Sequence, residues 1–248
     1  ADVDRFIEEP GKERVLKYSK RISKAVQETS ELPLEKIRGL RKEKIYYPRN
    51  YQGESLRINN LEQIDLYEGR YLILTRTINR LVEMTKELRK RNLYYQTNKG
   101  KRFPVRLYKA SIMYNSWCRG IELADKEIKD VTEIIGKPEN EWNNNVVWYD
   151  AFEESKLSDR EYIKTMMDNG ENLDEDARIY VSTIHAAKGG EEDNVILCLD
   201  LGRTIKKSVK KSDSKNDEEH RVWYVGSTRA RNNLYMLKAN KRKNEYKF

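Results

Sequence analysis

Two short stretches of the sequence hold residues whose types and spacing suit phosphate binding. In the first, Thr-Ile-His-Ala-Ala-Lys-Gly-Gly-Glu lies between two apolar runs and supplies Thr183, His185, Lys188, Gly189 and Glu191. Polar groups at the carboxyl end of a buried parallel strand lie where α/β sheets bind ligands, and glycine amides there can hold a phosphate. A threonine and a histidine at a strand end are more often structural, so this stretch alone decides nothing.

The second stretch, Gly-Ser-Thr-Arg-Ala-Arg, supplies Arg229 and Arg231 just before another apolar run. A guanidinium is permanently charged, and its planar fork of donors matches a phosphate group. Two surface arginines in salt bridges are the simpler explanation of this stretch taken singly, because exposed pairs are common and contribute only ~0–1 kcal/mol.

The composition adds a basic surplus. The 248 residues include 49 Lys and Arg against 41 Asp and Glu, with 16 Tyr and four Trp. Cations neutralise nucleic-acid phosphates and rings stack on bases, although a solvated lysine-rich surface explains the same composition equally well. Two cysteines and two histidines suggest neither a disulfide framework nor a metal site.

No apolar run approaches the length of a transmembrane helix, and no secretory signal opens the chain. We therefore expect a cytoplasmic protein without a membrane partner, located in the host cytoplasm if a phage encodes it. The chain begins without Met, which suggests a piece of a longer protein.

The elements that must position these residues alternate between strand and helix. Short β-rich apolar runs predict strands at residues 72–75, 180–184, 195–201 and 234–237. Helical spacing predicts helices at residues 15–40 and 79–91. Residues 206–220 are charged and of low complexity, and are predicted as a loop that is a candidate for disorder. A strand followed by a helix is the signature of a parallel α/β sheet.

A helical segment interrupts this pattern, with helices expected at residues 108–121, 125–135 and 159–167. We predict an α/β fold in which a parallel sheet, flanked by helices, is interrupted by a mainly helical insertion. The three parts are residues 1–93, 94–176 and 177–248. Within the insertion, the predicted phosphate contacts are Lys99, Lys101 and Arg102, whereas Tyr108, Ile112 and Trp117 are expected to pack its core rather than stack on bases.

Taken together, the motifs indicate a family. Thr-x-His-x-x-Lys-Gly with an acid soon after, followed later by Tyr-Val-x-x-Thr-Arg-Ala, resembles motifs V and VI of UvrD/PcrA/Rep-like superfamily 1 DNA helicases. A strand followed by Arg76-Thr, and a Tyr-Ser-Lys-Arg segment similar to motif IV with Ser19 and Arg21, extend the resemblance to most of the chain. It is weakest between residues 94 and 176. The chain thus resembles the C-terminal half of such helicases: the second RecA-like lobe with its inserted subdomain.

The resemblance implies an ATP-dependent DNA helicase or translocase that moves 3′ to 5′. Arg229 would be the arginine finger and Arg21 its companion, and such arginines are worth about 10³–10⁵ in rate. Glu191 and Gly189 would face the nucleotide. The residues implied to contact DNA are Thr183, His185 and Lys188, while Arg76 would either order the cleft or contact DNA.

The sequence contains no Gly-x-x-x-x-Gly-Lys-Ser/Thr and no recognisable Asp-Glu pair for a metal ion. The resemblance therefore implies that ATP and Mg²⁺ are held by an N-terminal RecA-like lobe outside this sequence. We expect that lobe and single-stranded DNA as partners, and a chain that alone binds neither ATP nor Mg²⁺ and is inactive. Gly190 and Glu192 replace the family's Leu and Phe, which removes apolar anchoring.

Two other functions stay open at this point. One is a non-enzymatic module that binds nucleic acid or protein and keeps only the helicase lobe. The other is a helicase–nuclease subunit of the RecB type, which would require a nuclease domain beyond Phe248.

Overall fold

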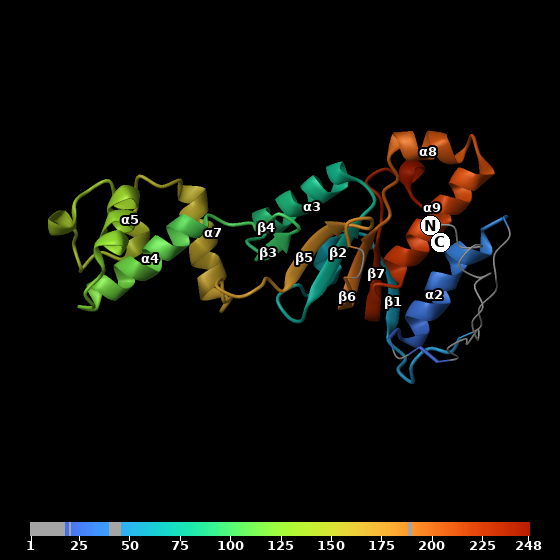
Figure 1. The fold of residues 1–248 in the computed structure, drawn as a ribbon, viewed down its shortest axis with the longest axis horizontal. Helices are drawn as coiled ribbons and strands as arrows, with labels where there is room; N and C mark the ends of the chain where they lie inside the picture. The colour runs from blue at the N-terminus through green and yellow to red at the C-terminus, as the bar shows by residue number, and fades with distance from the viewer. Residues whose placement is uncertain (1–17, 20, 40–45, 188–189) are drawn as a thin grey trace, which may run out of the picture.

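The computed structural model describes residues 18–19, 21–39, 46–187 and 190–248 (Figure 1). Its centre is a seven-stranded sheet in the order β1-β7-β6-β2-β5-β3-β4. All neighbouring strands are parallel except β3 and β4, which are antiparallel. The strands are β1 Glu54–Ile58, β2 Tyr71–Thr75, β3 Tyr95–Thr97, β4 Gly100–Lys101, β5 Ile179–Thr183, β6 Glu192–Cys198 and β7 Ala230–Leu237. The predicted α/β fold, a parallel sheet flanked by helices, is confirmed.

Strand β2 lies at the centre of the sheet, and all five of its residues are buried. A strand that is covered on both faces needs a continuous apolar run, which Tyr-Leu-Ile-Leu-Thr provides. Strand β2 pairs with β5 on one side and with β6 on the other. Strands β5 and β6 therefore do not form a hairpin, and of the residues between them Ile184 and Ala187 pack in the apolar cluster on one face of the sheet.

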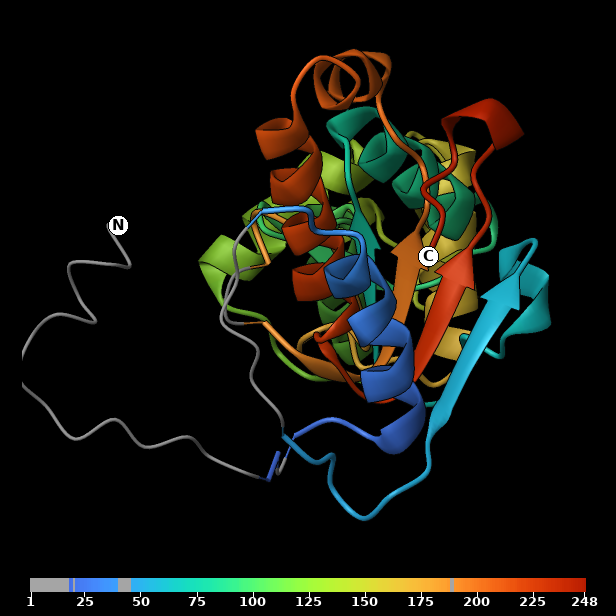
Figure 2. The same ribbon diagram turned by 90° about the vertical axis from the view of Figure 1, so that its right-hand side faces the viewer.

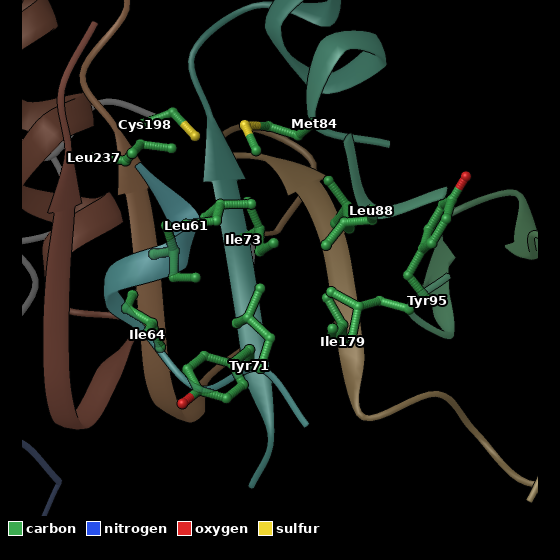
Figure 3. Packing of buried hydrophobic residues seen from close by; sticks show 14 of the residues in the cluster. Leu61, Ile64, Tyr71, Ile73, Met84, Leu88, Tyr95, Ile179, Cys198 and Leu237 are labelled. Atoms are coloured by element: carbon green, nitrogen blue, oxygen red, sulfur yellow. The ribbon is translucent and has the colours of Figure 1, made fainter. Parts of the chain in front are cut away.

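Two apolar clusters cover the two faces of the sheet. On one face, α2 (Lys24–Glu35) and α9 (Asp213–Ser227) contact each other and pack with buried residues of the sheet and of the segment after β5 (Figure 2). On the other face lie α3 (Ile78–Lys90) and the short helix η1 (Leu61–Gln63). Figure 3 shows Met84 and Leu88 of α3 against Ile73 and Ile179 of the sheet. Each face is thus sealed by its own helices.

Between β4 and β5 the chain forms a separate helical unit. Its helices are α4 Val105–Cys118, α5 Asp125–Ile135, η2 Glu139–Glu141, α6 Trp148–Ala151 and α7 Leu157–Asp168. They enclose a third apolar cluster whose members run from Tyr94 to Ala177, whereas Tyr95 belongs to the cluster under the sheet. The limits predicted at residues 94 and 176 stay a prediction.

Of three side chains expected in the core of this unit, Tyr108 is buried there and Trp117 is packed against it. The expectation was wrong for Ile112, which is 41% exposed. Residues 95–101 also depart from the helical pattern, because they add the strands β3 and β4 to the sheet.

Residues 206–220 are not a loop. They form most of α8 (Arg203–Val209) and the first half of α9, where the Ser212 side chain caps the helix by accepting from the amide of Lys215. The prediction failed because the buried residues of this half-helix are polar: Asp217 accepts from the amides of Arg38 and Gly39 at 3.0 and 2.8 Å. Tertiary contacts, not an apolar stripe, order the segment.

The helix expected at residues 15–40 is shorter in the described part. Helix α2 begins at Lys24 and ends at Glu35, and Ser23 before it has an extended backbone. Among the described helices, none combines the length and apolar character needed to cross a bilayer.

Candidate functional site

Three segments that are distant in the sequence meet at the amino ends of β6 and β7. The amide of Glu192 donates to the carbonyl of Arg229 at 3.1 Å, which aligns the starts of the two strands. The amide of Ser23 donates to the carbonyl of Arg231 at 2.9 Å, which joins the segment before α2 to β7. Arg21, Glu191 and the two C-terminal arginines are therefore brought to one place by backbone hydrogen bonds.

Glu191 lies between two of these arginines. Its carboxylate is 2.6 Å from Nε of Arg21 and 2.7 Å from Nη2 of Arg231. The hydrogen bond from Arg231 holds the pKa of Glu191 below its ordinary value, and the charges of Arg21 and Arg229 act in the same direction against the opposing effect of burial. The carboxylate is thus ionised and fixes the position of Arg21.

Arg229 follows the end of α9, and its Nε donates to the carbonyl of Val225 at 3.0 Å. Burial lowers the pKa of this arginine, and so does the nearby charge of Arg21, while Glu191 opposes both. Among the described residues, no carboxylate lies within ion-pair distance of Arg229. A half-buried cation beside another cation, without its own counter-charge, is a favourable place for an anion.

Arg21 offers a second sign of an anion site. Its Nη2 is buried, and within the described structure it has no hydrogen-bond acceptor. A buried polar atom normally has a partner, because leaving it unpaired costs about 1–3 kcal/mol. A phosphate oxygen would supply the missing acceptor, so the residues present fit the binding of a nucleotide phosphate.

The backbone segments around this cluster lie close against one another. Ser23 is fully buried and its hydroxyl donates to the carbonyl of Asn232 at 2.8 Å. Gly53 has φ of +64°, and a Cβ there would lie 2.2 Å from both the Asn232 carbonyl and the Ser23 hydroxyl. Only glycine fits this position, and it lets residues 21–23 lie directly against β7.

Two exposed tyrosines, one of them shortly before Arg21 in the chain, were missed by the sequence analysis. Tyr18 is 71% and Tyr47 54% exposed, and their ring centroids are 5.4 Å apart. Tyr18 stands three residues before Arg21, so its closeness to the motif was the available signal. Exposed rings of this kind can stack on a planar base.

Several of the residues predicted to contact DNA lie at the opposite, carboxyl edge of the sheet. Thr183 ends β5, and its hydroxyl accepts from the amide of Ala186 at 3.2 Å, which closes the turn that carries the exposed His185. Lys99 lies in the turn after β3 and so on the same carboxyl edge. Lys188 and Gly189 lie outside the described residues.

Arg76 follows β2 at this carboxyl edge, but its side chain is engaged inside the protein. Its guanidinium donates from Nε and Nη2 to the carboxylate of Glu219 in α9, each at 2.9 Å, and Glu219 also accepts from the indole of Trp223 at 2.8 Å. Both partners of the ion pair are largely buried. These contacts suit a residue that orders the structure. That is one of the two roles predicted for Arg76, the other being contact with DNA.

The other two predicted phosphate contacts differ from each other. The ammonium of Lys101 donates to the carbonyls of Leu173 and Asp174 at 2.8 and 2.5 Å, so it closes the base of the helical unit. Arg102 is exposed just after β4. The structure brings neither residue to the cluster around Glu191.

The described residues offer no evident ligands for a metal ion. In the part of the chain that the structure describes, no group of three or more His, Cys, Asp or Glu side chains is placed to hold one. Where Mg²⁺ binds stays a prediction.

The parallel sheet carries arginines at the amino ends of β6 and β7 and a threonine–histidine turn at the carboxyl end of β5, and helices cover both of its faces. A family model described as UvrD-like helicase C-terminal domain matches residues 3–241, so the chain belongs to that family and has its RecA-like fold. No curated protein matches the chain.

Proposed function

We propose that this chain is the C-terminal portion of an ATP-dependent DNA helicase or translocase, and that it supplies arginines to ATP held by an N-terminal RecA-like lobe. One observation carries the proposal. Arg21 and Arg229 lie together at the amino ends of β6 and β7, and the described residues give Nη2 of Arg21 no acceptor and Arg229 no carboxylate. Cationic groups in this state favour an incoming phosphate. Membership of the helicase family supports the same assignment.

In this proposal the arginines act electrostatically. During phosphoryl transfer, negative charge spreads over the equatorial oxygens of the γ-phosphate, and a guanidinium against them lowers the barrier. Arg229 is the arginine finger, and Arg21 contacts the same phosphates. Glu191 holds Arg21 in place and faces the ribose. The P-loop and the Mg²⁺ ligands belong to the other lobe.

Single-stranded DNA is proposed to bind at the carboxyl edge of the sheet, where Thr183 and His185 lie. Residues 184–191 connect that edge with Glu191, so a displacement of Glu191 by ATP would be transmitted along a short segment to the DNA-facing turn. The proposed roles of Lys188 on DNA and Gly189 on the nucleotide belong to this segment. Movement from 3′ to 5′ follows from the resemblance alone.

The test is Arg229→Ala in a protein that contains both lobes. We expect DNA-stimulated ATP hydrolysis to fall about 10³-fold or more, because the transition-state charge loses its partner, while ATP binding is kept. Arg119→Ala, at an exposed arginine of the helical unit, is the matched control and should hydrolyse ATP at the normal rate. Unchanged hydrolysis in Arg229→Ala would disprove the proposed role.

A further inference from the structure

Helix α8 and the short helix η3 (Arg242–Asn244) form a basic surface that the motor chemistry above does not use. We call it the α8–η3 surface. Its cations are Arg203, Lys206, Lys207, Lys210, Lys211, Lys241, Arg242 and Lys243. They come from two segments, one after β6 and one after β7, which are neighbouring strands in the sheet.

The charge of this surface is not compensated. Among the described residues, none of its eight cations has a carboxylate within ion-pair distance. The acids in the two segments are engaged elsewhere: Asp200 is 2.9 Å from Nε of Arg80, and Glu245 is paired with Arg57 and Lys247. Like charges held this close repel one another, so the surface favours a polyanion.

The surface also has a shape that can receive a ligand. A hollow of about 310 Å³ lies between α8 and η3. It is lined by Arg203, Lys206, Lys207, Lys210, Lys243 and Asn244, so every charged group around it is a cation. The ammonium of Lys206 donates to the carbonyl of Lys243, which ties the two sides of the hollow together.

The position of the surface connects it with the proposed DNA path. Both α8 and η3 follow the carboxyl ends of their strands, and Thr183 ends β5 on the same edge (Figure 1). One strand, β2, separates β5 from β6, and strands lie about 4.8 Å apart, so the two features are about two strand spacings apart along the edge. Gly202 at the start of α8 lies against Thr77, next to Arg76.

We propose that the α8–η3 surface binds the phosphate backbone of the single DNA strand that passes Thr183 and His185, and so extends the DNA path across β6 and β7. The inference rests on the proposed function for the presence of that strand.

The side chains around this surface favour DNA over a membrane or an apolar protein partner. Residues 199–248 are all described, and none of their large apolar side chains is exposed. A membrane or an apolar protein partner needs such side chains, whereas a phosphate backbone needs only cations.

The experiment measures binding of labelled oligo-dT to the 248-residue chain by fluorescence anisotropy over a series of salt concentrations. The test variant is Arg203→Gln/Lys207→Gln/Lys243→Gln, which leaves the contact of Lys206 intact. Neutralising three phosphate contacts should weaken binding at least tenfold at low salt and reduce the slope of log K against log salt by about 2. The control Lys126→Gln/Lys129→Gln/Lys156→Gln removes the same charge from exposed positions of the helical unit.

A loss of affinity and slope in the test variant alone supports the inference. Equal behaviour of both variants and the wild type overturns it and leaves the proposed function standing, since Arg229→Ala tests that separately. A wild-type chain that binds no oligo-dT overturns the inference together with the DNA part of the proposed function. The last measurement uses vesicles of phosphatidylserine and phosphatidylcholine. If the wild-type chain binds these vesicles and the test variant does not, while both bind oligo-dT equally well, the inference is also overturned.

Discussion

At the scale of single residues, Arg76 and Arg229 carry the same charge in opposite surroundings. Arg76 donates to a buried carboxylate in α9, whereas no described carboxylate pairs with Arg229. In the sequence, each of the two arginines follows a segment that can form a strand or a helix, and spacing alone gives no way to tell them apart. The partner of Arg76, Glu219, lies 143 residues away within a charged run, so only the folded chain reveals which arginine is occupied.

Replacement of Arg76 by Ala should therefore act on stability. The change leaves the carboxylate of Glu219 buried without its counter-charge, and we expect the free energy of unfolding to fall by about 3–5 kcal/mol. Urea denaturation measures this, with Arg70→Ala as the control: its pair with Glu192 is more exposed and should contribute less than ~1 kcal/mol. Adding Glu219→Gln to Arg76→Ala should restore part of the loss. An Arg76→Ala protein of normal stability that binds DNA poorly would assign Arg76 to DNA instead.

At the scale of elements, apolar periodicity predicts well where an element has an apolar face. Strand β2 and helices α3 and α5 lie within a residue or so of their predicted limits because their buried residues are apolar. The first half of α9 has buried Asp217 and Glu219 instead, so no such face exists there to be recognised. The meeting of Arg21 with Glu191 likewise depends on backbone hydrogen bonds between distant segments, and only the resemblance to helicases predicted it.

The approach of α9 to the sheet gives the prediction at this scale. A Cβ at Gly226 would lie 3.1 Å from Cδ1 of Leu197 and 3.2 Å from Cδ1 of Ile184. Helix propensity alone predicts that Gly226→Leu stabilises the protein by about 0.8 kcal/mol. We expect the opposite sign, a loss of about 1–3 kcal/mol, because the added side chain overpacks the contact between helix and sheet. Thermal and urea unfolding measure it, and Arg221→Leu, at an exposed site of α9, should change stability little. A stabilised Gly226→Leu would contradict the packing argument.

At the scale of the whole molecule, the sheet places the two proposed sites at its opposite edges. The arginines lie at the amino ends of β6 and β7, and the threonine–histidine turn lies at the carboxyl end of β5. The helical unit stands away from both, at one end of the elongated molecule, and has its own apolar cluster (Figure 1). It is joined to the sheet by the chain after β4 and the chain before β5, and by side-chain contacts at its base: Nη2 of Arg89 in α3 is 2.5 Å from the carboxylate of Asp159 in α7, and the hydroxyl of Tyr162 donates to the carbonyl of Leu93.

Because the cores are separate, damage to one should leave the other intact. Phe152 is fully buried in the helical unit, and Phe152→Ala should destabilise that unit by about 3–5 kcal/mol through loss of contacts and a new cavity. Hydrogen exchange followed by mass spectrometry should show faster exchange in α4, α5 and α7, with β2, β5 and β6 still protected. The control Ile73→Ala, in the cluster under the sheet, should reverse this pattern. Faster exchange throughout the chain in Phe152→Ala would contradict this prediction and mean that the helical unit and the sheet unfold as one.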